Sequence, residues 1–61
     1  MKSIGQMIRQ LEGLVGTSDL NDWENDFVEN QVQRTGHGKM TEGLSEKQVE
    51  IIQKIYNKHF A

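Results

Sequence analysis

The chain contains no cysteine, no proline and no long apolar run. Without cysteine, neither a disulfide nor a thiolate-ligated zinc ion can hold the fold together, so its stability must come from apolar burial. The longest apolar runs, such as Ile51-Ile52, are two residues long, which excludes a membrane-spanning helix. The residues after Met1 enter a helical pattern without the apolar core of a secretory signal, so we expect a cytoplasmic protein.

The size and charge of the chain narrow its class further. Sixty-one residues predict one small domain, 1–61. This length is near the lower limit for a chain that folds without a disulfide or a bound metal ion. Apolar residues make up 34% and charged residues 26%, a balance that is polar yet too mixed for an evidently disordered tail. A net charge of −2 argues against a general nucleic-acid coat protein, because such proteins are normally basic.

The first of three amphipathic stretches covers about residues 3–14. It begins with the capping box Ser3-x-x-Gln6, and Gly13 and Gly16 mark its end. Its apolar positions recur every three or four residues, as on one face of a helix. They are Ile4, Met7, Ile8, Leu11, Leu14 and Val15.

A second helix is predicted over about residues 19–33, with Ser18 or Asp19 as its N-cap. Its apolar face carries Leu20, Trp23, Phe27 and Val28, with Val32 at the margin. Glu24 projects at the angle of this apolar face. Its carboxylate is therefore expected to pair with a lysine or to cap a neighbouring helix, or else to lie outside the core at a partner site.

Residues 34–43 lack an apolar period and contain glycines, which predicts a glycine-rich loop before the last helix. The third helix, about 46–59, has the clearest start, because Ser45 and Gln48 form a capping box. The three stretches together predict an all-α fold, a three-helix mini-bundle. Its expected core includes Ile8, Leu11, Trp23, Phe27, Ile52 and Ile55.

The sequence shows no motif of a known catalytic or cofactor site: no phosphate-binding loop, dinucleotide fingerprint, zinc-protease helix or nucleophile elbow. Of the two histidines, His37 is expected to face solvent in the loop and His59 to lie at a frayed helix end. We therefore expect no catalytic residue, no metal and no cofactor. A non-enzymatic protein is the better prediction.

Negative charge is concentrated in the second helical stretch. Residues 17–33 hold five carboxylates and no basic residue, whereas the rest of the chain sums to +3. Four of the carboxylates share one face of the predicted helix: Asp19, Asp22, Asp26 and Glu29. Like charges stacked at helical spacing destabilise a helix mildly, so this face is a candidate protein-binding surface for a basic partner. The alternative is a solvated face partly neutralised by lysines of the third helix.

Positive charge lies mainly in the second half of the chain, and it offers a second candidate surface. The residues in question are Arg34 and Lys39 in the loop and Lys47, Lys54 and Lys58 along one face of the third helix. Cations in such a row contact phosphates, so the alternative interpretation is a direct nucleic-acid-binding module.

One pattern resembles a known protein module. Asp22-Trp23-Glu24-x-x-Phe27-Val28, a glycine-rich spacer and Leu44-Ser45-x-Lys47-Gln48-x-x-x-Ile52-x-x-Ile55 are similar to a short helical module of phage and prophage proteins. That module occurs alone or attached to proteins of DNA metabolism, and the similarity covers residues 20–60. The resemblance implies a viral setting and a helical fold, and it assigns no activity.

Three functional hypotheses follow. The leading one is a non-enzymatic phage-type protein that binds a basic surface of a nucleic-acid-processing protein, as an accessory factor or as an inhibitor of a host defence nuclease system. The second is direct nucleic-acid binding through the lysine face. The third is a self-associating bundle, a homo-oligomer in which the apolar face of the first helix pairs between copies.

Overall fold

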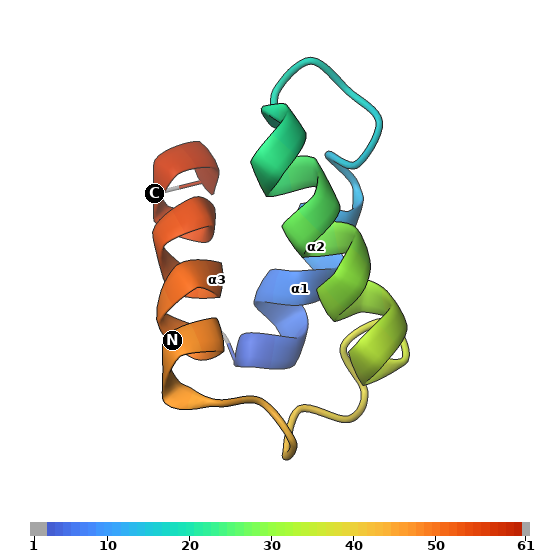
Figure 1. The fold of residues 1–61 in the computed structure, drawn as a ribbon, viewed down its shortest axis with the longest axis vertical. Helices are drawn as coiled ribbons and strands as arrows, with labels where there is room; N and C mark the ends of the chain where they lie inside the picture. The colour runs from blue at the N-terminus through green and yellow to red at the C-terminus, as the bar shows by residue number, and fades with distance from the viewer. Residues whose placement is uncertain (1–2, 61) are drawn as a thin grey trace.

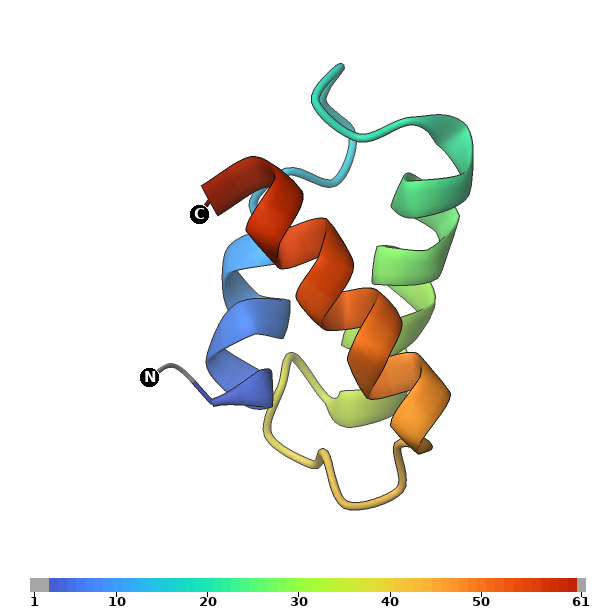
Figure 2. The same ribbon diagram turned by 90° about the vertical axis from the view of Figure 1, so that its left-hand side faces the viewer.

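Three helices form the protein in the computed structural model, which describes residues 3–60 (Figure 1). They are α1 (Ile4–Glu12), α2 (Asp22–Thr35) and α3 (Glu46–Phe60). Helix α1 packs against both other helices, while α2 and α3 run in opposite directions (Figure 1). Figure 2 shows α3 in front, lying over α1 and α2. No strand occurs within residues 3–60, so the prediction of an all-α three-helix mini-bundle is confirmed.

The capping boxes predicted for the first and third helices are both present. Ser3 Oγ accepts a hydrogen bond from the Gln6 amide at 3.2 Å, and Gln6 Oε1 accepts one from the Ser3 amide at 3.0 Å. Ser45 and Gln48 make the same reciprocal pair at the start of α3. Helix α1 ends at Glu12, two residues earlier than predicted, with Gly13 as its C-cap.

Helix α2 begins later than the sequence pattern suggested. Its N-cap is Asn21, whose Oδ1 accepts a hydrogen bond from the Glu24 amide at 2.7 Å, while Glu24 Oε1 accepts one from the Asn21 amide at 3.1 Å. The prediction of Ser18 or Asp19 as the cap is therefore wrong. Asparagine is as good a cap as serine, and Asn21-x-x-Glu24 satisfies two otherwise unpaired amide groups.

The core is aliphatic, and it differs from the predicted core at two aromatic positions. Its buried apolar residues are Ile8, Leu11, Leu20, Val28, Val32, Ile52 and Ile55. Trp23 is 59% exposed and Phe27 only half-buried, so the prediction that both are central is wrong. The interior side of α2 is instead formed by Glu24, Val28, Gln31, Val32 and Thr35, a face rotated away from the two rings.

The loop before α3 is fastened to α1 by backbone contact. Gly5 and Gly38 approach so closely that a Cβ atom on either would collide with the carbonyl oxygen of the other. Gly38 also has φ +89°, a conformation that favours glycine. The buried Thr35 hydroxyl accepts a hydrogen bond from the Gly38 amide at 3.0 Å, which holds the loop in this position.

Candidate functional site

The most prominent surface feature is an aromatic stack on α2. The rings of Trp23 and Phe27 lie one helical turn apart, with centroids separated by 5.4 Å and planes only 7° from parallel. Stacking fixes the orientation of the indole while more than half of Trp23 stays in solvent. A large ring held in place and exposed is typical of a binding anchor, because little side-chain entropy remains to be lost.

An acidic stripe lies on the outer side of the same helix. It consists of Asp22, Asp26 and Glu29, which are exposed and follow one another at i, i+4 and i+7. Within residues 3–60, none of these three carboxylates forms an ion pair. Asp19 precedes the helix in an exposed turn, so its predicted place on the same helical face is wrong.

Glu24 is the acidic residue that does have a basic partner. Its carboxylate is buried, and Lys58 Nζ donates a hydrogen bond to Glu24 Oε2 at 3.2 Å. Burial by itself raises the pKa of the Glu24 carboxyl. Hydrogen bonds from the Asn21 backbone and Lys58, together with the positive charges of Lys58 and His59, outweigh burial and bring that pKa below its ordinary value. The expected pairing of Glu24 with a lysine is therefore confirmed.

The histidines are placed differently from what the sequence suggested. His59 is not frayed: its ring is largely buried, and Nε2 lies 3.7 Å from Glu24 Oε1, beyond hydrogen-bond distance. His37 is exposed as expected, but its Nδ1 lies 2.9 Å from Glu12 Oε2. Within residues 3–60, no group of three or more histidine and carboxylate side chains is arranged to hold a metal ion.

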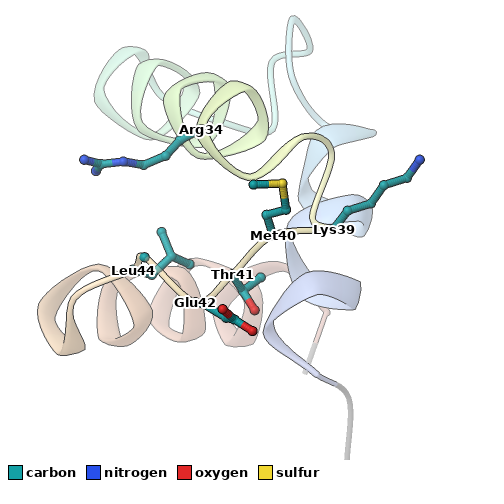
Figure 3. A pocket seen from close by; sticks show the side chains of 7 residues that line it. Arg34, Lys39, Met40, Thr41, Glu42 and Leu44 are labelled. Atoms are coloured by element: carbon teal, nitrogen blue, oxygen red, sulfur yellow. The ribbon is translucent and has the colours of Figure 1, made fainter.

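The predicted basic residues divide into two groups. Lys47, Lys54 and Lys58 are exposed along one side of α3, and we call them the lysine stripe. Arg34 and Lys39 line a loop cavity of about 510 Å³ together with the exposed Met40. Figure 3 shows that the side chains of Arg34 and Lys39 extend in opposite directions, so they flank this cavity and do not converge on one point within it.

A second hollow, not anticipated from the sequence, lies between α2 and α3; we call it the α2–α3 groove. Its volume is about 530 Å³, and it is lined by Phe27, Asn30, Gln31, Gln33, Arg34 and Gln48. The Oε1 atom of Gln31 is buried and has no hydrogen-bond partner in the described part of the chain. Only the packing of two helices distant in sequence brings these residues together.

The exposed stack was also missed from the sequence, although a signal for it exists. Asn21-x-x-Glu24 is a capping box, and it shifts the predicted start of the helix by three residues. With that start, the Glu24 side chain accepts the hydrogen bond from the Asn21 amide on the buried side of the helix. Trp23, one residue earlier, then points toward solvent.

Comparison with known proteins adds no assignment: no family model, no curated protein and no solved structure matches the chain. Among the helices of residues 3–60, none combines the length and the apolar character required to cross a membrane.

Proposed function

We propose that this protein is a non-enzymatic binding module that docks onto a basic surface of a nucleic-acid-processing protein through the outer side of α2. The observation that carries the proposal is the exposed Trp23, stacked on Phe27 and bordered by the acidic stripe. The sequence pattern of residues 20–60 resembles a phage module, and this resemblance favours a role as an accessory factor or as an inhibitor of a host nuclease system.

The aromatic stack supplies the affinity in this proposal. Tryptophan is the residue most often found to dominate an interface, and a ring that is already oriented loses little freedom on binding. The partner is expected to present an apolar pocket that receives the indole. Contacts around such an anchor contribute mainly by excluding water from it.

In this proposal, the acidic stripe attracts the basic partner and increases the rate of association. Asp22, Asp26 and Glu29 have no cationic neighbour within ion-pair distance in the described structure, so their field is not cancelled locally. The lysine of α3 that does reach α2 pairs with Glu24 instead. An uncompensated acidic row beside an apolar anchor steers association with a basic surface and makes that association sensitive to salt.

Self-association through the first helix has less support. Ile8 and Leu11 of α1 are buried within the chain, and the neighbouring apolar residues of this helix are partly covered. The face that would pair between copies is thus occupied by α2 and α3.

The test is capture of a partner from host-cell lysate on the immobilised protein, followed by measurement of its affinity for the purified variants. Trp23→Ala is expected to lose most of the binding, and the triple variant Asp22→Asn, Asp26→Asn, Glu29→Gln is expected to slow association. Phe60→Ala, which truncates another exposed aromatic residue, is the matched control and should bind as wild type does.

Circular dichroism must show that each variant is folded before its binding is compared. A captured protein whose affinity is unchanged by Trp23→Ala and by the acidic triple variant would refute the proposed surface. Loss of binding only on replacing Lys47, Lys54 and Lys58 with Gln would assign the function to the lysine stripe.

A further inference from the structure

The α2–α3 groove has a lining unlike the rest of the surface. Its walls carry four carboxamides, one guanidinium and one aromatic ring, and no carboxylate, although the chain is acidic overall. Carboxamides present both donors and acceptors in a plane, which suits a planar ligand with its own amide-like edge. The volume of about 530 Å³ lies within the range of small-molecule pockets, roughly 300–1,000 Å³.

Gln31 is the polar group in this groove whose hydrogen bonding is incomplete. The residue is 4% exposed, and its Oε1 has no partner within the described structure. Buried polar atoms are nearly always paired in folded proteins, so this oxygen is an acceptor open to a donor from a ligand. The terminal amide torsion of glutamine has a broad energy profile, so the oxygen can turn toward a donor that enters the groove.

Within the groove lining, the positive charge comes from one residue. Arg34 lines the groove from α2, and Gln48, which follows Lys47, lines it from α3. The lysine stripe faces this side, because Lys58 reaches across to Glu24 of α2. Arg34 also lines the loop cavity, so a strand that follows the groove meets this cation where the two hollows adjoin (Figure 3).

We propose that the α2–α3 groove binds one unpaired nucleotide of a single-stranded nucleic acid. The base lies against Phe27 and donates an N–H group of its Watson–Crick edge to Gln31 Oε1. Arg34, which lines the groove, contacts an adjoining phosphate, and Lys47 and Lys54, which form no ion pair within residues 3–60, attract the strand. Duplex does not fit this arrangement, because its Watson–Crick edges are already paired and its bases are stacked.

This site shares Phe27 with the aromatic stack of the docking surface, but it does not include the acidic stripe. The acidic stripe supplies none of the groove lining, although Asn30 and Gln33 of the groove each follow a stripe residue by one helical turn. An acidic peptide is the rival ligand, since it also offers amide groups and negative charge. A nucleotide is favoured because Phe27 and the adjoining Trp23 provide an aromatic surface on which a base can stack. The side chains of aspartate and glutamate have no aromatic ring to stack there.

The experiment measures fluorescence anisotropy of labelled strands of about 10 nucleotides, a length typical of single-strand binding sites. The probes are single-stranded DNA, RNA of the same sequence, the corresponding duplex, an abasic strand and a poly-glutamate peptide. Binding to DNA or RNA about tenfold tighter than to the abasic strand or the duplex is the expected result. The DNA and RNA arms then identify which sugar the groove accepts.

Variants connect the binding to the groove. Gln31→Leu removes the amide at similar size and is expected to weaken strand binding about tenfold, while its melting temperature stays at or above that of wild type. Gln53→Leu, an exposed glutamine on α3 outside this groove, is the matched control and should not change binding. Arg34→Gln should reduce the dependence of binding on salt.

Three results would overturn the proposal: equal affinity for the abasic and the normal strand, wild-type strand binding by folded Gln31→Leu, or binding of poly-glutamate in the absence of strand binding. The triple variant of the acidic stripe should retain strand binding, because it removes only negative charge outside the groove. Failure of protein docking and failure of strand binding are thus separable.

Discussion

The carboxylate of Glu24 and the ammonium group of Lys58, 34 residues apart in the sequence, form a hydrogen-bonded ion pair with Nζ and Oε2 3.2 Å apart. The pair joins the beginning of α2 to the end of α3. The other carboxylate oxygen of Glu24 accepts a hydrogen bond from the Asn21 amide, as part of the capping box of its own helix. One buried carboxylate thus serves both the local start of a helix and the contact between two helices.

The first prediction concerns pH. The pKa of Glu24 is lower in the folded chain than its ordinary value, so the folded state binds this proton less tightly than the unfolded state does. The stabilising contribution is complete above the unfolded pKa and is lost as pH falls through the folded pKa. Urea denaturation of wild type at pH 7 and at about pH 3 should show this loss, and Glu24→Gln should show less of it.

Lys58→Met is the companion variant in that experiment, because it removes a cation that lowers the pKa of Glu24 and keeps most of the aliphatic chain. Its loss leaves the buried carboxylate of Glu24 without its ion-pair partner and should cost at least about 1 kcal/mol at pH 7. An identical pH dependence in wild type and Glu24→Gln would show that other carboxylates control the acid response.

The second prediction concerns stability at the aromatic stack. Trp23→Ala should cost about 1 kcal/mol, since it removes one exposed stacking contact and leaves the core intact. Leu11→Ala removes a fully buried side chain and should cost about 2–5 kcal/mol, enough to unfold a bundle of this size. Thermal melts followed by circular dichroism compare the two. A Trp23→Ala variant as unstable as Leu11→Ala would contradict the exposed position of the ring.

The third prediction tests where α2 begins. Asn21→Ala removes the cap of the Glu24 amide and should cost about 1 kcal/mol. Ser18→Ala changes an exposed residue in the preceding turn, so its unfolding free energy should stay within about 0.5 kcal/mol of wild type. Chemical denaturation measures both. The opposite ranking would place the helix start at Ser18.

The fourth prediction concerns the contact between the loop and α1. Gly38→Ala should destabilise the fold by at least about 1–2 kcal/mol, because alanine disfavours a φ of +89° and its Cβ would meet the Gly5 carbonyl. Gly43→Ala is the matched loop control: nothing lies within 4 Å of its added Cβ, and its φ is not positive. Equal melting temperatures for the two variants would mean that the loop does not need this backbone contact.

Local sequence signals predicted the helices because their causes are local. The boxes Ser3-x-x-Gln6 and Ser45-x-x-Gln48 satisfy backbone amides within three residues, so they do not depend on tertiary contacts. The helical apolar period predicted that Ile8, Leu11, Ile52 and Ile55 belong to the core, and all four are buried. The pairing of Glu24 also followed from its position, because a carboxylate at the apolar angle requires a partner.

Tertiary packing decided the features that carry the functional proposals. Hydrophobicity alone ranks Trp23 and Phe27 as core residues, but the interior is filled by smaller aliphatic side chains, and the pair remains on the flank of α2. The α2–α3 groove combines residues of two helices whose separation depends on how both pack on α1. The sequence by itself thus determined the helix caps of α1 and α3 and the apolar period. The exposure of Trp23 and the α2–α3 groove depended on how the three helices pack around one small core, which no local sequence signal specifies.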